Sequence, residues 1–300
     1  REGQPDPAQG PAAGGGGSHE GGNGLHARQL HGHDKYHGPL RARKRFFRFD
    51  NRIVCLGSDI ENRAEGGVHT TLFQNFLENG SDPIEVNGEQ VTAFPYERTL
   101  VQGALLRDNL RNLYIVPQGS VCVGKRHQHS LHEETDAPTE NDFASAWIDH
   151  GEGEVNGAGY EYLMVVHASD REAARYAEEL PYEVLRRDST AHIVSARLTG
   201  IVGYALFCGG EVGEGWLERV SMPSLVMIVG GEKTLTVSVC DPDLRFYEGP
   251  CDEVFEAAET RMERSIYSRT WIDNPSGESR LDVTLRGCWQ FVEATDTCRA

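Results

Sequence analysis

The sequence lacks every short motif that would by itself identify a catalytic centre. It contains no G-x-S-x-G nucleophile elbow, no H-E-x-x-H metal motif, no P-loop and no dinucleotide-binding glycine fingerprint. None of its seven cysteines forms a C-x-x-C pair, which argues against a zinc ribbon or a thioredoxin-type centre. Asp149 and His150 are adjacent, but consecutive strand residues face opposite ways and make no simple dyad. Motifs therefore assign no catalytic residue, no metal ligand and no cofactor.

Positive charge is scarce, and long apolar runs are absent. The 300 residues include 29 Lys and Arg against 46 Asp and Glu, which gives a net charge of −17 at pH 7. A protein of this charge has no bulk attraction to nucleic acid or to an anionic membrane face. No run of about 18 apolar residues is present, so a membrane span is excluded. We expect neither nucleic acid nor a membrane as a partner.

The cysteines and the first residues leave the cellular compartment open. The chain begins at Arg1 and shows no charged-then-apolar leader. Cysteines within apolar runs, such as Cys55 and Cys122, are expected to be buried free thiols. Cys251 and Cys298 lie in polar surroundings and would be able to pair if the protein is exported.

Glycine is abundant, with 34 residues, and is concentrated near the front in Gly14–Gly17 and Gly21–Gly24. Residues 1–24 contain too little apolar surface to offset the entropy lost on ordering. We therefore predict a flexible Gly- and Pro-rich lead-in over residues 1–24.

Short strands dominate the remainder of the chain. Asn87-Gly88, preceded by Ile84 and Val86 and followed by Val91, predicts a β-hairpin, and an Asp50-Asn51 turn joins two further strands. Strand patterns recur every ten to fifteen residues, which predicts a large antiparallel sandwich or two stacked ones. One helix interrupts them: Ser169-Asp170 offers an N-cap, an Ala- and Glu-rich stretch follows, and Pro181 ends it. We place a domain boundary near residue 180.

A basic row stands out against the negative net charge. Strand alternation would place Arg41, Arg43 and Arg45 on one face, where their guanidinium groups could bind the sulfates or carboxylates of a polyanion. The alternative is a solvated edge strand whose charges block edge-to-edge pairing.

Two histidine groups have the spacing of metal ligands. His127 and His129 would share a strand face, and with His132 they could hold zinc; the alternative is a polar strand end running into an acidic loop. His31-Gly32-His33-Asp34 repeats the spacing, and an exposed polar turn is the favoured interpretation there. A tryptophan in an alternating strand, such as Trp147 in Ala144–Ile148, is expected in the core rather than at a sugar-binding surface.

Longer strings in the chain carry a family resemblance. They are, in order, Asp50–Ile60, Thr70–Gln74, Pro138–Glu140, Ser145–His150, Tyr160–Tyr162, Tyr182–Asp188, Thr199–Tyr204 and Asp241–Leu244. This colinear series closely resembles the central β-sandwich of polysaccharide lyase family 8, which comprises the chondroitin, hyaluronate and xanthan lyases, with the chondroitin ABC branch nearest. A weaker resemblance to the same family is found at Leu281–Gln290.

The resemblance implies an all-β fold and a role in glycosaminoglycan cleavage. Residues 25–180 would be the latter part of an antiparallel super-sandwich, and residues 181–300 a smaller C-terminal β-sandwich, with one short helix between. The family's enzymes cleave at uronic acid by β-elimination, with Asn, His, Tyr and Arg on an N-terminal α/α toroid. Those residues precede the matched strings, so the resemblance carries over no catalytic residue. We expect that the N-terminal half of the enzyme, with the toroid, is missing from this chain.

Three hypotheses follow from these observations. The first is that the chain is the C-terminal β portion of a secreted or periplasmic glycosaminoglycan lyase, inactive without its toroid and requiring no cofactor. The second is a free-standing carbohydrate-binding β module that holds an anionic polysaccharide through Arg41, Arg43 and Arg45. The third is a zinc site at His127, His129 and His132.

Overall fold

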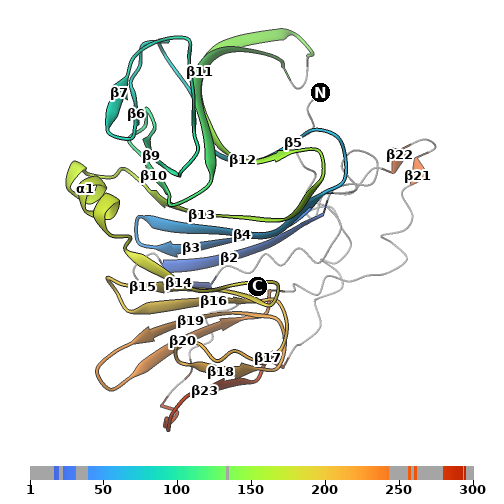
Figure 1. The fold of residues 1–300 in the computed structure, drawn as a ribbon. Coiled ribbons are helices and arrows are strands. Elements are labelled where there is room, and N and C mark those ends of the chain that lie inside the picture. Colours follow the sequence, from blue (N-terminus) through green and yellow to red (C-terminus); the bar gives the residue numbers. More distant parts are fainter. Residues whose placement is uncertain are drawn as a thin grey trace.

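The protein is built from antiparallel strands, as a computed structural model shows (Figure 1). The structure describes residues 17–19, 23–31, 40–132, 135–242, 256–257, 260–261, 280–292 and 294. Within this part of the chain the one helix is α1 (Asp170–Glu178), which lies between β13 (Val155–Val165) and β14 (Tyr182–Arg187). The predicted all-β class with a single short helix is confirmed.

Two sheets make up the first part of the chain. The larger has nine strands, in the spatial order β1 (Gly17–His19), β2 (Asn23–His31), β3 (Arg41–Phe49), β4 (Arg52–Asn62), β13 (Val155–Val165), β10 (Leu113–Val116), β9 (Ala104–Arg107), β6 (Ile84–Val86) and β7 (Glu89–Val91). The smaller has four strands, in the order β5 (Gly67–Phe76), β12 (Pro138–Glu152), β11 (Ser120–Leu131) and β8 (Tyr96–Leu100).

The second part of the chain adds two more sheets. One has five strands, in the order β14 (Tyr182–Arg187), β15 (Ala191–Ala196), β16 (Ile201–Leu206), β19 (Ser224–Gly230) and β20 (Leu235–Cys240). The other has three strands, in the order β17 (Gly210–Glu211), β18 (Leu217–Val220) and β23 (Val283–Leu285). A separate ribbon pairs β21 (Glu256–Ala257) with β22 (Thr260–Arg261).

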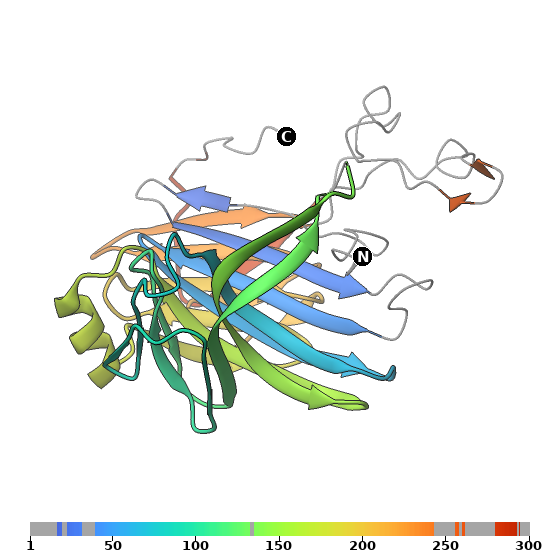
Figure 2. The same cartoon turned by 90° about the horizontal axis from the view of Figure 1, so that it is seen from above.

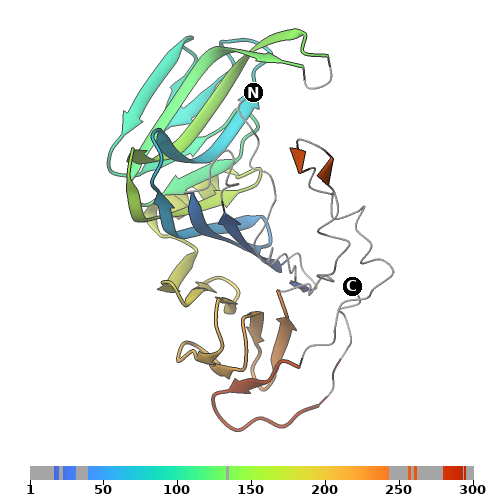
Figure 3. The same ribbon diagram turned by 90° about the vertical axis from the view of Figure 1, so that its right-hand side faces the viewer.

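The four sheets are stacked as layers, with a separate apolar core between each successive pair (Figures 1 and 3). The first core lies between the four- and nine-stranded sheets, the second between the nine- and five-stranded sheets, and the third between the five- and three-stranded sheets. The nine-stranded sheet is thus covered on both faces. On β4, Val54 and Leu56 belong to the second core, whereas Cys55 and Ile60 belong to the first.

Local signals account for several chain reversals. Asn87 and Gly88 both have positive φ, of 51° and 82°, as the predicted hairpin turn between β6 and β7 requires. Ser169 caps α1, and Glu172 completes a capping box with it. The side chain of Glu172 also accepts a hydrogen bond from Asn51 at 3.2 Å, which ties the β3–β4 turn to the helix.

Two strands begin earlier than the sequence predicts. β1 (Gly17–His19) and the start of β2 (Asn23–His31) fall within residues 1–24, where we expected a flexible lead-in. Pairing between these strands uses backbone hydrogen bonds, which a glycine-rich segment makes without any hydrophobic pattern. The rest of residues 1–24 lies outside the described residues, and the domain boundary near residue 180 stays a prediction.

No helix in the described part of the chain has both the length and the apolar character needed to cross a membrane.

Buried polar contacts accompany the second core. Nε2 of His192, on β15, lies 2.8 Å from the hydroxyl of Ser58, on β4. Tyr182, on β14, donates a hydrogen bond of 2.8 Å to Glu161, on β13. His192 is fully buried, and desolvation, with the positive charge of Arg45 adding to it, lowers the pKa of His192 from 6.5 to about 3.

The pKa of His192 predicts acid sensitivity of the packing between the nine- and five-stranded sheets. Because the native pKa lies below the unfolded value, the unfolded chain takes up this proton first as the pH falls. The stability that comes from keeping His192 neutral is fully present above pH 6.5 and is lost as the pH falls toward 3. The free energy of unfolding should therefore fall by about 3 kcal/mol between pH 6.5 and pH 4. Thermal unfolding of wild type and His192→Asn at pH 7, 5 and 4 measures it.

We expect the unfolding midpoint of His192→Asn to fall less steeply with acid than that of the wild type, whatever its value at pH 7. His167→Asn is the matched control, since His167 is exposed and its φ of 49° suits asparagine. Equal acid slopes for wild type and His192→Asn would contradict the assignment.

Candidate functional site

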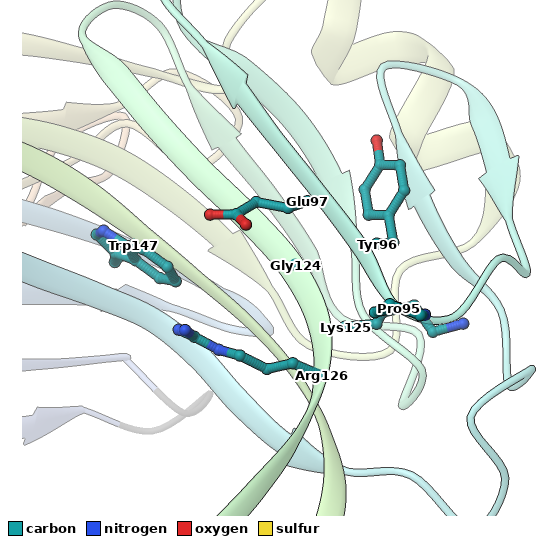
Figure 4. A pocket seen from close by; sticks show the side chains of 7 residues that line it. All are labelled: Pro95, Tyr96, Glu97, Gly124, Lys125, Arg126 and Trp147. Atoms are coloured by element: carbon teal, nitrogen blue, oxygen red, sulfur yellow. The ribbon is translucent and has the colours of Figure 1, made fainter.

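A pocket of about 300 Å³ lies on the outer face of the four-stranded sheet, away from the first core. Its lining residues come from the β8 end, β11 and β12 (Figure 4): Pro95, Tyr96, Glu97, Gly124, Lys125, Arg126 and Trp147. We refer to it as the Trp147 pocket. The side chains of Trp147, Arg126 and Glu97 lie on one side of β11 in Figure 4.

Strand register explains why these side chains meet. Trp147 lies directly opposite Cys122, and Gly124 and Arg126 follow Cys122 at intervals of two, so all four positions share the outer face. Gly124 also lines the pocket, at a point where a Cβ would come within 3.0 Å of the carbonyl oxygen of Tyr96. A register shift between β12 and β5 falls between Ala146 and Trp147.

The pocket combines an aromatic face with a cation. The guanidinium carbon of Arg126 lies 5.4 Å from the ring centroid of Trp147, within cation–π range. The ring centroid of His69, on the neighbouring strand β5, lies 5.6 Å from that of Trp147. An indole face offers apolar surface to sugar C–H groups, and a guanidinium group matches carboxylate or sulfate. The arrangement is chemically suited to an anionic sugar.

The structure corrects the expectation that Trp147 belongs to the core. Its neighbours Ala146 and Ile148 are buried in the first core, whereas Trp147 is half-buried and lines the pocket. The alternation of Ala144–Ile148 already indicated this position, because successive side chains of a strand point to opposite faces. If Ala146 and Ile148 face the core, Trp147 faces away from it.

Lys125 does not contribute its ammonium group to the pocket opening. Its side chain points to the other side of β11 from Trp147 (Figure 4), and the residue is 0% exposed. Desolvation lowers the pKa of Lys125, and the negative charge of Asp82 opposes that effect. The amino group of Lys125 is therefore buried at a cost and is not a ligand group of the pocket opening.

The structure separates the predicted basic row by depth. Arg41 is exposed, Arg43 is half-buried in an ion pair with Asp59, and Arg45 is only 4% exposed. Alternation does place Arg43 and Arg45 on one face, since their guanidinium carbons lie 5.3 Å and 4.3 Å from the ring centroid of Phe207. That face is covered by the five-stranded sheet. Binding of polysaccharide by the row stays a prediction.

The alternative interpretation of the basic row as an edge strand is wrong. β3 (Arg41–Phe49) pairs with β2 on one side and with β4 on the other, so it lies inside the nine-stranded sheet. Desolvation, followed by the charge of Arg43, lowers the pKa of Arg45 to about 9, which leaves it charged at neutral pH. Arg45 therefore buries a cation against Phe207.

The histidine cluster is confirmed in part. His127 and His129 share a face of β11, with ring centroids 4.8 Å apart. The third group beside them is Glu140 of β12, not His132, which follows the end of β11. The hydrogen bond that the His127 ring donates to the Asp142 carboxylate, together with the nearby Glu140, raises the pKa of His127.

Several sequence predictions concern groups outside the described residues. The side chain of His31 and the residues His33 and Asp34 fall there, as do Cys251 and Cys298. The cysteines that the structure describes are free thiols; Cys55 is buried as predicted, whereas Cys122, which was also expected to be buried, is half-buried.

Comparisons with known proteins place this architecture among the polysaccharide lyases. Residues 3–177 match the family described as polysaccharide lyase family 8, super-sandwich domain. The chain is 37% identical over 282 residues to a chondroitin sulfate ABC exolyase of Bacteroides thetaiotaomicron, and 34% identical over 275 residues to that of Proteus vulgaris. These alignments cover 92% and 90% of this chain.

The chain spans only about a quarter of these relatives, 26% and 27% of their respective lengths. Among solved structures, a xanthan lyase of Paenibacillus is similar in fold, with a TM-score of 0.69 over 78% of this chain and 24% of that one. Its sequence identity is 21%, so that likeness concerns the fold alone.

The burial of Arg45 generates a stability prediction. Arg45→Ala removes a buried cation–π contact and the packing of the side-chain stem, so we expect the free energy of unfolding to fall by about 2–4 kcal/mol. Arg41→Ala removes an exposed side chain of the same type, and its effect should stay within about 0.5 kcal/mol. Urea unfolding of the three proteins measures both. Equal losses in the two variants would contradict the placement of Arg45.

Proposed function

Because the chain belongs to polysaccharide lyase family 8, we propose that it is the C-terminal β portion of a glycosaminoglycan lyase. The substrate would be chondroitin or dermatan sulfate, or hyaluronan, and the reaction a β-elimination at uronic acid. The observation that carries this proposal is the match of residues 3–177 to the super-sandwich domain, extended by the ABC exolyase relatives over nine-tenths of the chain. These β layers would support the cleft and brace an N-terminal α/α toroid.

The chemistry explains why such a portion would be inactive alone. Removing the C5 proton of a uronate requires neutralisation of its carboxylate, a base, and an acid for the leaving oxygen. Burial raises the pKa values of Tyr160 and Tyr162, which is the opposite of what a tyrosinate base needs. Desolvation lowers the pKa of His150 to about 4, and its Nε2 is engaged with the hydroxyl of Thr70 at 2.8 Å.

The location would follow the substrate. Glycosaminoglycans are large, charged polymers, so we propose a secreted or periplasmic enzyme, in line with the family resemblance.

The first prediction from this proposal is that the chain alone has no lyase activity. Purified chain is mixed with chondroitin sulfate, and the ultraviolet absorbance of the unsaturated uronate product is followed. We expect no rise above the protein-free blank, because the base and the carboxylate-neutralising groups would lie on the toroid. The Bacteroides thetaiotaomicron exolyase under the same conditions is the positive control. A steady rise with the purified chain would overturn the inactive-portion proposal.

A second candidate function is a carbohydrate-binding β module, which the Trp147 pocket favours. The guanidinium group of Arg126 lies over the indole ring of Trp147, and both side chains line the outward-facing pocket, a pairing of cation and aromatic surface that suits a sulfated or uronate-containing sugar. Binding here needs no catalytic group.

The pocket predicts measurable, salt-sensitive binding of a chondroitin sulfate oligosaccharide. Trp147→Ala and Arg126→Ala should each weaken the affinity at least about fivefold, which corresponds to about 1 kcal/mol. Calorimetry is performed at low salt and at about 0.5 M salt, where the screening length is shorter. The loss of affinity between the two conditions measures the electrostatic contribution to binding. Arg41→Ala tests the sequence-predicted basic row in the same assay.

Trp216→Ala is the matched control for binding, since Trp216 is also partly exposed (39%) but lies beside Trp289, outside the pocket. Unchanged affinity in Trp147→Ala and Arg126→Ala would exclude the pocket. A loss confined to Arg41→Ala would move the binding surface to β3.

A further inference from the structure

Three potential metal ligands meet at the β11–β12 hairpin. They belong to His127, His129 and Glu140, each of which offers a ligand atom within 4.8 Å of the others; Nε2 of His127 and Nδ1 of His129 both face the same Glu140 carboxylate oxygen. Strand pairing sets their positions, because His129 lies directly opposite Glu140 and His127 lies two residues along the same strand face. The backbone hydrogen bonds of two strands therefore hold the three groups together without a metal.

The distances suit a small divalent ion. The Glu140 oxygen lies 3.2 Å from Nδ1 of His129 and 3.6 Å from Nε2 of His127. Zinc with bonds of about 2.0–2.1 Å in tetrahedral geometry places its ligands roughly 3.3 Å apart. Two imidazoles and one carboxylate form a recognised zinc donor set, which leaves a fourth position for water or an external ligand.

A fourth residue orients one of the ligands. Nδ1 of His127 lies 2.7 Å from a carboxylate oxygen of Asp142, the residue opposite it on β12. This contact directs Nε2 of His127 toward Glu140. A histidine ligand commonly makes such a contact with a carboxylate through its other ring nitrogen, which fixes the ring and increases its basicity.

The surroundings leave the cluster open to an ion from solution. His127, His129 and Glu140 are all exposed, and the adjoining ends of β11 and β12 are exposed on both faces. Figure 2 shows this end of the hairpin extending beyond the stacked sheets. A ribbon with so little apolar contact has weak local stability, and a cross-strand ion would strengthen it.

We propose that His127, His129 and Glu140 form a zinc-binding site, with Asp142 positioning His127, that clamps the outer end of the β11–β12 hairpin. The proposal is independent of glycosaminoglycan cleavage. It differs from the ligand set that spacing alone indicates, because Glu140 replaces His132.

Calorimetric titration of the purified chain with ZnCl₂, in a buffer that does not chelate, tests the site. The chain has twelve histidines, so variants rather than total zinc uptake must locate the binding. His129→Ala and Glu140→Gln should each abolish one class of zinc site. Asp142→Asn should weaken that site about 10- to 100-fold. Mg²⁺ in excess should not compete, since imidazole ligands disfavour it.

His132→Ala is the matched control, because it removes a neighbouring histidine that the structure places outside the ligand set. It should keep the wild-type zinc site. Retention of the site in Glu140→Gln, or its loss in His132→Ala, would overturn the proposal and leave the cluster as ion pairs only.

Amide hydrogen exchange provides a readout of the clamp. Zinc should slow exchange at the outer end of β11 and β12 in the wild type and have no such effect in Glu140→Gln. Thermal unfolding in the presence of a chelator checks that the variants fold, and their midpoints should match that of the wild type because the side chains are exposed. Equal zinc-dependent protection in both proteins would contradict the assignment.

Discussion

Burial of the nine-stranded sheet on both faces is the constraint on which the rest of the structure depends. A sheet covered on one side presents an apolar face to one core only, whereas β4 supplies residues such as Val54 and Cys55 to opposite cores. The other sheets are stacked on its two faces. The four-stranded sheet covers one face, the five-stranded sheet covers the other, and the three-stranded sheet packs on the five-stranded one. Loss of either covering sheet would expose a full apolar face to water.

Burial on both sides also explains the unusual polar residues between the layers. Arg45 and His192 lie between the nine- and five-stranded sheets, and the ring of Phe207 is 4.3 Å from the guanidinium carbon of Arg45 and 5.0 Å from the imidazole of His192. A cation and a neutral imidazole at this depth are costly unless aromatic and hydroxyl partners accompany them. This packing therefore ties the orientation of the two sheets to a few specific contacts, as well as to apolar area.

The two surface sites illustrate how far pattern reasoning reaches. Period-two alternation correctly placed His127 and His129 on one face, because strand geometry is local. It could not identify Glu140 as their neighbour, since that depends on the register between β11 and β12. Trp147 was expected in the core, although alternation puts it and Ala146 on opposite faces; only the assembled sheets show that the Trp147 face is open.

By itself the sequence determined the all-β class, the hairpin at Asn87-Gly88, the capped helix that follows Ser169 and the family resemblance, because these rest on local chemistry or on long colinear strings. Polar strands such as β8 (Tyr96–Leu100) carried no clear alternation and escaped prediction. Tertiary structure alone decided that Arg45 is buried while Arg41 is exposed. The physical reason is that burial depends on which sheet covers a face, and that contact joins residues more than 150 positions apart.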